Sequence, residues 1–403
     1  MNASSVEISL HEQLELLRTC VEENLDLSTE LSRLGKTYDT LRYKHSESHN
    51  GSLFNDGYYR TLLDFEHSSH GIPTVSFFSG AGGLDLGFEA AGFSHLASIE
   101  INETFCDTLR SNRNRWAVLG PPLHSGDIRN KDEFSHLLRE KVGIKAPFEG
   151  IFHGGPPCQS FSIAANQRFT KEDENFKRVG FSHATNGNLL FDFIWYIIEF
   201  KPRAFLIENV PGLLTIDNGE QVTEAIKLLR KNGYEILEPS VLNAANYGVP
   251  QNRHRAFIIG SRTGQVVLPE QEPSIVPVIA ALKQSVNGNE NHITRNHRAD
   301  SVLRYMELKY GQRDQVGRVD RLNPKLPSKT IIAGGNKGGG RSHLHPEIPR
   351  TLSVRESARL QTFPDDYIFA GAPARQYTQM GNAVPPLLAM KLANQILAGV
   401  YGS

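Results

Sequence analysis

The sequence has little cysteine, which limits the stabilising and metal-binding chemistry open to it. Its 403 residues include three cysteines, Cys20, Cys106 and Cys158, and none of them forms a Cys-x-x-Cys pair. A disulfide framework and a cysteine-based zinc site are therefore both disfavoured, and a reducing, intracellular setting is favoured. Any of the three thiols could simply fill a core, so the surrounding sequence has to separate them.

The sequence also lacks a long uninterrupted hydrophobic run. No run approaches the roughly 18 residues of a membrane-spanning helix, because the longest, around 189–200, is bordered or interrupted by Asn188, Asp192 and Glu199. The first residues contain neither the basic start nor the apolar block of a signal peptide. With 39% hydrophobic and 22% charged residues, the composition is typical of a globular protein with a sizeable core. We expect no membrane association and a cytoplasmic location.

Net charge is nearly absent as well, since the formal value is -1 at pH 7. The charges are unevenly distributed, however: residues 1–70 hold 12 acidic and 6 basic side chains, whereas residues 291–345 hold 4 acidic and 11 basic ones. A locally basic surface of the second kind is expected where a protein binds nucleic acid. The same bias also fits an ordinary solvated face, so charge alone leaves both interpretations open.

The N-terminal segment is predicted to be helical. Leucines at positions 10, 14, 17, 31 and 34 fall near helical spacing with acidic residues between them, which predicts one or two amphipathic helices that end near Gly35. The polar stretch 45–52 then has the composition of a linker. We interpret 1–72 as a helical extension and linker, either a brace packed on the main domain or a module for dimerisation or operator binding.

From residue 73 the pattern changes to short apolar runs separated by helix-compatible segments. The runs cover 74–78, 95–99, 150–152, 204–207 and 256–259, and the helical segments include 84–91, 188–200 and 221–231. This alternation predicts an α/β fold with a doubly wound, mostly parallel sheet. In such sheets ligands bind beyond the carboxyl ends of the strands, so the loops after these runs are the place to look for chemistry.

The alternation stops after Gly260, which suggests further domain boundaries. Residues 262–349 are rich in Gly, Pro, Asn, Arg and His and are predicted to form a small domain with few regular elements. Core-like periodicity resumes in a final helix near 386–397. We therefore predict a sheet domain at 73–261, the irregular domain at 262–349, and a C-terminal segment, 350–403, that returns to the sheet domain.

The first apolar run leads into a glycine-rich turn, Phe78-Ser79-Gly80-Ala81-Gly82-Gly83. Glycines between a strand and a helix let the backbone approach a ligand, and the helix start offers free N–H groups. Glu100 lies 20 residues after Gly80, at the end of the second run, where an acid can accept hydrogen bonds from ribose hydroxyls. The dinucleotide pattern fails because Asp85 occupies the last glycine position. An adenosine-containing cofactor without a pyrophosphate fits better, although a purely structural turn is an equally open interpretation.

The most specific local signal is the sequence from Gly154 to Ser162, Gly-Gly-Pro-Pro-Cys-Gln-Ser-Phe-Ser, which follows a predicted strand. Its thiol, Cys158, should project at the carboxyl edge of the sheet, whereas a core cysteine would more often lie within the apolar run. An exposed thiol near positive charge is held as the nucleophilic thiolate. Arg253 and Arg255 are candidates to supply that charge.

Two further segments place charged side chains near the same edge. Glu208 follows the strand at 204–207, where a carboxylate can meet a bound base or simply cap the next turn. Arg253 and Arg255 precede the strand at 256–259 and lie on one face by strand alternation. An arginine pair suits a phosphate or a buried carboxylate, and it could also be ordinary surface charge.

Taken together and in order, these segments resemble the DNA cytosine-5 methyltransferase family over roughly 73–397. The resemblance extends to further motifs, which are Gly126-Asp127-Ile128, Pro157-Cys158-Gln159, Glu208-Asn209-Val210, Gln251-x-Arg253-x-Arg255, Arg350-x-Leu352-Ser353-x-Arg355-Glu356-x-x-Arg359-Leu360-Gln361-x-Phe363-Pro364, and Gln379-x-Gly381-Asn382-Ala383-Val384-Pro385. One departure is Ser76, where many members carry aspartate. The resemblance implies the fold of S-adenosylmethionine-dependent methyltransferases, with 262–349 as a target recognition domain.

The resemblance also assigns residues to roles. The catalytic residues would be Cys158, Glu208, Arg253 and Arg255, with no metal. Residues that would bind S-adenosylmethionine are Phe78, Ser79, Gly80, Ala81, Gly82, Gly83, Glu100, Ile101, Asp127, Ile128, Pro157, Leu189, Asn382 and Ala383. Residues that would contact double-stranded DNA are Gln159, Ser162, Arg168, Thr330 and Arg341.

By the same resemblance, the Cys158 thiolate would add to C6 of a cytosine and thereby activate C5. Because a thiol cannot reach a base inside a duplex, the base must be flipped out, and we expect the polar stretch 164–187 to be a mobile loop that closes over DNA. The protein would act as a monomer on DNA, associate with the bacterial nucleoid and protect DNA from a cognate restriction endonuclease. Three alternatives are an RNA cytosine methyltransferase, a nucleotide-dependent oxidoreductase and a DNA-binding regulator that uses 1–70.

Overall fold

The computed structural model describes residues 8–46, 60–65, 69–157, 189–282, 286, 288–333 and 343–402. The chain forms two compact units, each built from separate stretches of sequence. The sheet unit contains 61–247, 253–273 and 383–403, and the second unit contains 1–60, 248–252 and 274–382. The chain thus crosses between the units several times, and the segment before residue 61 belongs with 274–382.

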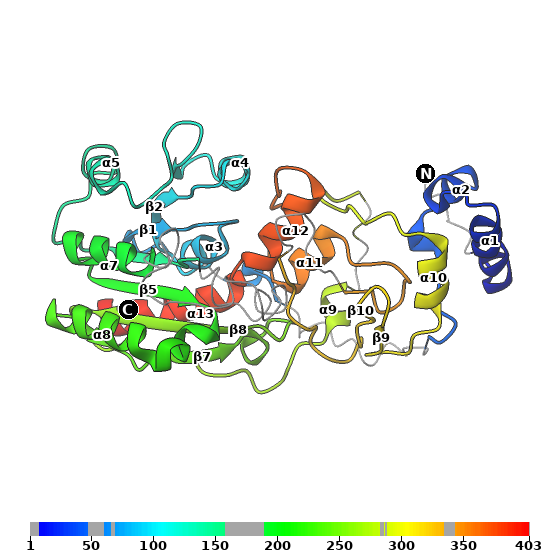
Figure 1. The fold of residues 1–403 in the computed structure, drawn as a ribbon. Helices are drawn as coiled ribbons and strands as arrows, with labels where there is room; N and C mark the ends of the chain where they lie inside the picture. The colour runs from blue at the N-terminus through cyan, green and yellow to red at the C-terminus, as the bar shows by residue number, and fades with distance from the viewer. Residues whose placement is uncertain are drawn as a thin grey trace. The chain divides into compact units, whose positions relative to one another are not determined.

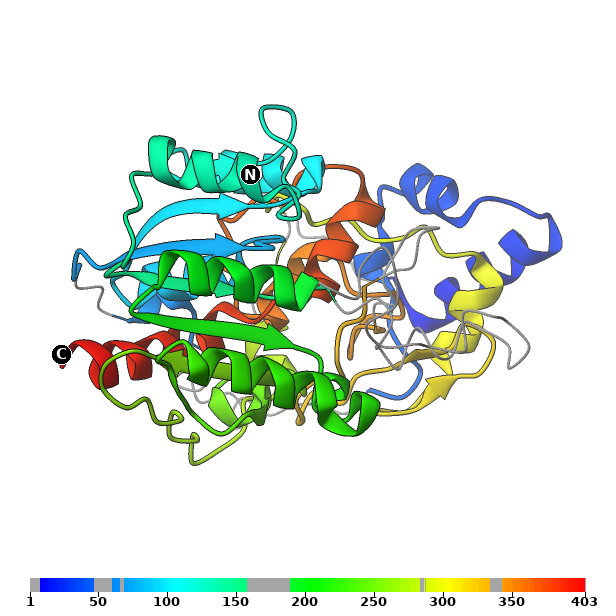
Figure 2. The same cartoon turned by 60° about the vertical axis from the view of Figure 1, so that its left-hand side comes forward.

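The sheet unit is built on eight strands within the described residues, in the order β3-β2-β1-β4-β5-β8-β6, with β7 also paired to β8. Strands β1 to β5 are parallel to one another, whereas β8 runs antiparallel to β5, β6 and β7. The strands are β1 Pro73–Phe77, β2 Ser94–Ile99, β3 Ala117–Leu119, β4 Ile151–Gly154, β5 Ala204–Asn209, β6 Glu235–Ile236, β7 Ser240–Asn243 and β8 His254–Ser261. The predicted mostly parallel α/β sheet is confirmed (Figures 1 and 2).

Helices cover both faces of this sheet because its strands are apolar on both sides. On one face the core is formed with α5 (Lys131–His136), α7 (Leu189–Phe200) and α8 (Glu220–Lys231). Phe77 of β1 packs its ring 4.7 Å from Phe193 and 5.3 Å from Tyr196, both on α7. On the other face Phe88 of α3 (Gly83–Ala90) stacks on His153 of β4 at 4.2 Å. Helix α4 (Glu103–Asn112) follows β2.

The C-terminal helix α13 (Pro386–Ile396) packs directly on α3. Two glycines of α3 allow the close approach: a Cβ on Gly83 would lie 2.1 Å from the carbonyl oxygen of Val384, and one on Gly87 would lie 2.3 Å from the Cβ of Ala389. The helical stretch Pro373–Tyr401 is long and apolar enough to cross a membrane by length and composition, but 72% of its apolar window is buried. It is therefore a core element of the fold.

The second unit holds shorter elements and long irregular connections. Its described elements are α1 (Leu10–Glu22), α2 (Leu27–Arg33), α9 (Val278–Leu282), α10 (Ala299–Met306), β9 (Arg313–Asp314), β10 (Val319–Asp320), α11 (Val354–Leu360) and α12 (Pro373–Asn382). The predicted N-terminal helices are present and end at Arg33. Helix α1 packs against α10, so the N-terminal segment is part of the second unit (Figure 1).

Candidate active site

The carboxyl ends of the parallel strands β1, β2, β4 and β5 lie at one edge of the sheet. Three of the loops that the sequence singled out follow these ends: the glycine turn after β1, Glu100 after β2, and Gly155 to Pro157 after β4. Glu208 is the penultimate residue of β5 at the same edge. The fold therefore brings residues that are up to 130 positions apart into one row of loops.

The glycine turn and Glu100 are joined by hydrogen bonds. The Gly80 N–H donates to Glu100 Oε2 at 2.8 Å, and the Asn102 N–H donates to Oε1 at 2.7 Å. Gly80 and Gly82 have φ values of 57° and 77°, which suit glycine, and Phe78 also adopts a left-handed φ of 55°, uncommon for an aromatic residue. Glu100 is 7% exposed, and this burial raises the pKa of its carboxyl group.

The side chains around Glu100 differ in their exposure to solvent. Ile101 is 57% exposed, so an apolar side chain stands open beside the acid. Ile128 is buried, and its carbonyl accepts the hydroxyl hydrogen of Tyr196 at 2.8 Å. Asp127 pairs instead with Arg129, with 2.6 Å between Oδ2 and Nη2. The backbone at Gly126 lies against Glu100, because a Cβ there would come 2.1 Å from the Glu100 carbonyl oxygen.

A buried polar cluster beneath the glycine turn was not foreseen from the sequence. Asp85, in the first turn of α3, accepts hydrogen bonds from Ser76 Oγ at 3.1 Å and Ser98 Oγ at 2.9 Å. Ser79 of the turn donates to Ser76 at 2.9 Å, and His95 lies 3.4 Å from Asp85. Burial raises the pKa of Asp85 to about 7, against the opposing effect of these hydroxyl donors. The residue that broke the dinucleotide pattern thus ties β1 and β2 together under the turn.

Glu208 and Arg255 form a buried ion pair at the sheet edge. Arg255 Nε lies 2.8 Å from Glu208 Oε1, and both side chains are largely withdrawn from solvent. Burial raises the pKa of Glu208, while the charges of Arg255 and Arg253 act in the opposite direction. Arg253 is fully buried, and burial lowers the pKa of its guanidinium. The prediction that these arginines suit a buried carboxylate holds directly for Arg255.

The loop that leads toward Cys158 is held by the end of β5. The Asn209 side chain donates to the carbonyl oxygen of Pro156 at 3.1 Å. Gly155 leaves space for Glu208, since a Cβ at Gly155 would lie 2.6 Å from Glu208 Oε2. Pro157 is exposed at the end of the described stretch. The Glu208-Asn209 pair therefore fixes both a carboxylate and the backbone two residues before the cysteine.

The remaining predicted residues either lie outside the described residues or belong to other segments of the chain. Those outside are Cys158, Gln159, Ser162, Arg168 and Arg341, together with the stretch 164–187. Leu189 is the buried first residue of α7, and Ala383 is also buried, whereas Asn382 ends α12 and is exposed. Thr330 lies in the second unit, where its hydroxyl donates to the carbonyl oxygen of Asn252 at 2.6 Å.

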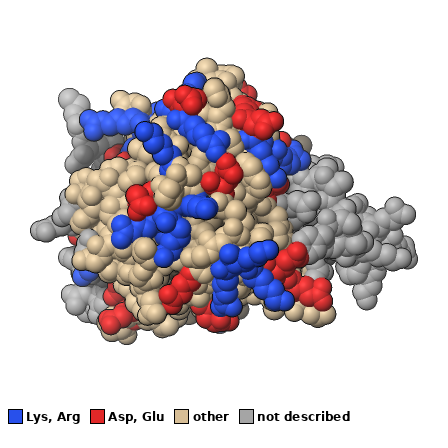
Figure 3. All heavy atoms as spheres, turned by 90° about the vertical axis from the view of Figure 1, so that its left-hand side faces the viewer, with Lys and Arg blue, Asp and Glu red and all other residues tan. Residues whose placement is uncertain are grey.

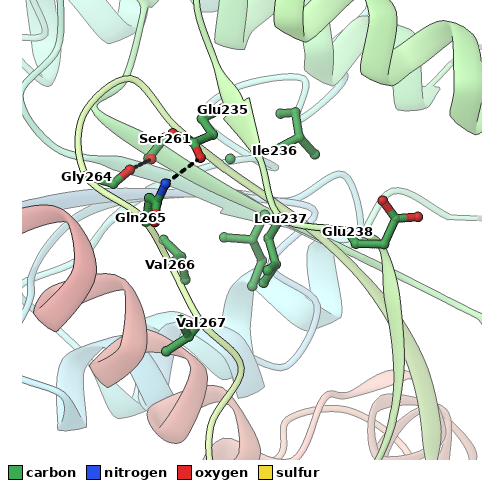
Figure 4. Close-up of a pocket in the computed structure, with 11 residues that line it drawn as sticks. Glu235, Ile236, Leu237, Glu238, Ser261, Gly264, Gln265, Val266 and Val267 are labelled. Atoms are coloured by element: carbon green, nitrogen blue, oxygen red, sulfur yellow. Dashed lines mark hydrogen bonds between the residues drawn. The ribbon is translucent and has the colours of Figure 1, made fainter.

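A small cavity of about 250 Å³ occurs elsewhere on the sheet unit, lined by residues 235–238, 259–261 and 264–267 (Figure 4). Ser261 in its lining pairs with Ala204 at the start of β5, so the cavity lies at the end of the strand opposite Glu208. Figure 3 shows positive and negative side chains interspersed on the face that it presents, among the described residues. Neither this cavity nor this face brings together the glycine turn, the buried carboxylates and the arginines that meet at the carboxyl edge.

Comparison with known proteins gives a consistent result. The family model for C-5 cytosine-specific DNA methylases matches residues 72–398. The chain is similar to the Type II methyltransferase M1.HphI of Haemophilus parahaemolyticus, with 34% identity covering 81% of this chain and 87% of the relative. It is also similar to M.PspPI of a Psychrobacter strain, with 35% identity covering 82% of this chain and 80% of the relative.

Among solved structures, a putative DNA modification methyltransferase encoded within an Escherichia coli prophage matches with a TM-score of 0.66 and 23% identity, over 82% of this chain and all of that one. At this identity the likeness supports the fold alone, and the family match supplies the chemistry. The match to a DNA methylase family disfavours both the oxidoreductase and the RNA methyltransferase alternatives. The chain belongs to the C-5 cytosine-specific DNA methylase family and is a DNA cytosine-5 methyltransferase.

Proposed function

We propose that this enzyme methylates C5 of a cytosine within a specific double-stranded DNA sequence, with Cys158 as nucleophile and Glu208 as the group that holds the base. The observation that carries the proposal is the Glu208–Arg255 pair at the carboxyl edge of the sheet, 2.8 Å between Nε and Oε1. The same strand end anchors Pro156, two residues before Cys158. A buried carboxylate and a thiol would then lie on neighbouring loops.

The residues present fit S-adenosylmethionine as the cofactor, which supplies a methyl group bonded to a positively charged sulfur. Each Glu100 oxygen accepts one backbone N–H, and a carboxylate oxygen has a second lone pair for a ribose hydroxyl. The open side chain of Ile101 offers an apolar surface to a flat ring. The turn from Phe78 to Gly83 provides close backbone approach, and Asp127, Ile128, Pro157, Leu189, Asn382 and Ala383 complete the proposed set.

The chain's own residues account for activation of the base. Cys158 forms a bond to C6, and the ring electrons displaced by this addition make C5 nucleophilic. Glu208 Oε1 is held by Arg255, so Oε2, the oxygen beside Gly155, is directed to the N3 and amino edge of cytosine. Since burial raises the pKa of Glu208, this carboxyl can hold a proton at N3 as charge builds on the ring. Once C5 carries the methyl group, it loses its proton to water, and the C5–H electron pair forms the C5–C6 double bond as the Cys158 thiolate leaves C6.

We further propose how DNA is engaged. The target base would leave the helix stack to reach Cys158, with Gln159, Ser162 and Arg168 contacting DNA near it. Residues 262–349 would form the target recognition domain, with Thr330 and Arg341 at the DNA, between a catalytic domain at 73–261 and a returning segment at 350–403. The enzyme would act as a monomer in the bacterial cytoplasm, at the nucleoid, and protect DNA from a cognate restriction endonuclease.

The experiment that tests the proposal compares the cysteines. Wild type, Cys158→Ala and Cys20→Ala are incubated with labelled S-adenosylmethionine and duplex DNA, and a second set receives duplex DNA that contains 5-fluorocytosine. Fluorine at C5 cannot leave as a proton, so the bond to the enzyme persists under denaturation. We expect label transfer and a trapped complex with wild type and Cys20→Ala and neither with Cys158→Ala. Methyl transfer by Cys158→Ala at the wild-type rate would refute the covalent route.

A further inference from the structure

The segment 38–45 connects the N-terminal helices to the rest of the second unit and is held by specific polar contacts as well as by packing. Tyr38 donates its hydroxyl hydrogen to the carbonyl oxygen of His297 at 3.0 Å, and Tyr43 donates to that of His345 at 2.9 Å. The guanidinium of Arg321 stacks on the Tyr43 ring at 3.5 Å and donates to the carbonyl oxygen of His45 at 2.7 Å. Each of these contacts joins this segment to residues more than 250 positions away.

Asp39 is the most consequential residue of this segment. Its Oδ1 accepts a hydrogen bond from Arg350 Nε at 2.6 Å, and its Oδ2 lies 3.3 Å from His292 Nε2. Burial alone would raise the pKa of Asp39, but the hydrogen bond from His292 and the charge of Arg350 lower it well below its usual value. The carboxylate is therefore ionised at neutral pH and serves as a fixed counter-charge.

Arg350 carries this contact to α11. Its side chain is 1% exposed, and its two terminal nitrogens donate to both oxygens of Glu356, each at 2.8 Å. Glu356 in turn accepts the backbone N–H of Ser353 at 2.7 Å, which forms the capping box at the start of α11. A single buried guanidinium thus bridges two carboxylates, one from the N-terminal segment and one from the helix that follows the recognition region.

A hydrogen-bonded path continues from Arg350 to the backbone at Thr330. The carbonyl oxygen of Arg350 accepts the N–H of His345 at 2.8 Å, and the Leu352 N–H donates to the carbonyl oxygen of His343 at 2.8 Å. The His343 ring lies 3.3 Å from the Thr330 carbonyl oxygen. All of these residues belong to the second unit.

We infer that Asp39 is a positioning residue for DNA target recognition, acting through Arg350 and the segment 343–352 on the backbone at Thr330. This inference rests on the proposed role of Thr330 and the recognition region in contacting DNA. It gives the N-terminal segment a part in target recognition, as a component of the recognition unit rather than as a separate regulatory module. Residues 8–46 together with 288–333 and 343–356, which come from distant parts of the sequence, then act jointly in target recognition.

The test uses full-length Asp39→Ala and Asp39→Asn, with Asp26→Asn as the matched control. Asp26 is an acid of the same segment whose side chain caps its own helix through the Thr29 N–H at 2.8 Å. Unmethylated genomic DNA and labelled S-adenosylmethionine give KM for each substrate and kcat, and sequencing of modified cytosines gives the ratio of cognate to near-cognate sites. S-adenosylmethionine affinity, measured by calorimetry, reports on the sheet unit.

We expect Asp39→Ala to raise KM for DNA roughly 2- to 30-fold and to lower the site ratio, with unchanged affinity for S-adenosylmethionine. Asp39→Asn, which retains an acceptor for Arg350, should recover part of the loss, and Asp26→Asn should match wild type. Combining Asp39→Ala with Thr330→Ala should give less than the product of their separate effects, because both act on one path.

Two results would overturn the inference. One is wild-type KM for DNA and wild-type site ratio in both Asp39 variants. The other is an equal loss of every activity and of cofactor affinity in both, which would indicate a general folding role. Failure of the proposed function is distinguishable, because wild type itself would then transfer no methyl group to duplex DNA.

Discussion

Gly155→Ala offers a test in which activity and stability should separate. The added Cβ would lie 2.6 Å from Glu208 Oε2, which is about 0.8 Å short of the 3.4 Å at which ordinary contact begins. The atom it meets is the end of a side chain, so the carboxylate can rotate away at little cost to the fold. However, Glu208 Oε1 is held by Arg255 at 2.8 Å, and rotation moves both oxygens away from the base. A displacement near 1 Å at a reacting group costs on the order of 100-fold in rate.

We therefore expect Gly155→Ala to lower kcat about 100-fold while the midpoint of urea unfolding and the Kd for S-adenosylmethionine stay near wild type. The neighbouring glycine provides the contrast, because a Cβ on Gly154 would lie 2.4 Å from the backbone oxygen of Phe77, which cannot move aside. Gly154→Ala should lose stability as well as activity. Wild-type kcat in Gly155→Ala would refute the requirement for a fixed Glu208 carboxylate, and a parallel loss of cofactor affinity would show that the change spreads to the glycine turn.

Three further predictions concern the cofactor side of the sheet. Glu100→Ala removes the acceptor of the Gly80 N–H and the proposed acceptor of the ribose hydroxyls. Hydrogen bonds to a charged group contribute about 1.5–3 kcal/mol, so the Kd for S-adenosylmethionine should rise by one to two orders of magnitude. An unchanged Kd in calorimetry would contradict the ribose assignment. Because burial raises the pKa of Asp85 to about 7, the folded state binds this proton more tightly than the unfolded state, and wild type should gain stability relative to Asp85→Asn as pH falls from 8 toward 4. The gain is at most about 4 kcal/mol, and urea unfolding at several pH values that gives parallel curves for the two proteins would disprove it. Gly87→Ala places a Cβ 2.3 Å from that of Ala389 and should destabilise the sheet unit by about 1–3 kcal/mol through overpacking, which a wild-type unfolding midpoint would contradict.

The sheet and its functional edge were predictable because short apolar runs mark strands that are buried on both faces. Phe77 and Ile207 belong to such runs, and both lie in the core. The row of functional loops follows from the same prediction, since parallel strands end at one edge. Three short strands of the sheet were missed, β3 with three residues, β6 with two and β7 with four, because so few residues show no recognisable alternation.

Pairings between distant residues could be predicted only in part. The sequence predicted that Arg255 suits a buried carboxylate or a phosphate, and the structure identifies the carboxylate as that of Glu208. In the sequence, Asp85 was noted only as the residue that occupies the last glycine position of the dinucleotide pattern. Its hydrogen-bond partners Ser76 and Ser98 lie on two different strands, so the sequence did not indicate the buried cluster that they form. The bond between Asp39 and Arg350 spans 311 positions, a distance over which periodicity in one sequence carries no information.

The direction of β8 determines which side chains reach the working edge of the sheet. Every parallel strand brings the residues that follow it to that edge, but β8 is reversed relative to β5 and pairs Ala256 with Asn209. Arg253, which precedes β8, and Arg255, its second residue, therefore arrive where the other strands finish. Had β8 run the other way, these two cations would lie at the far end of an eight-residue strand, roughly 23 Å from Glu208. The antiparallel direction of β8 thus places arginines at the edge where the parallel strands place the glycine turn and the acidic side chains.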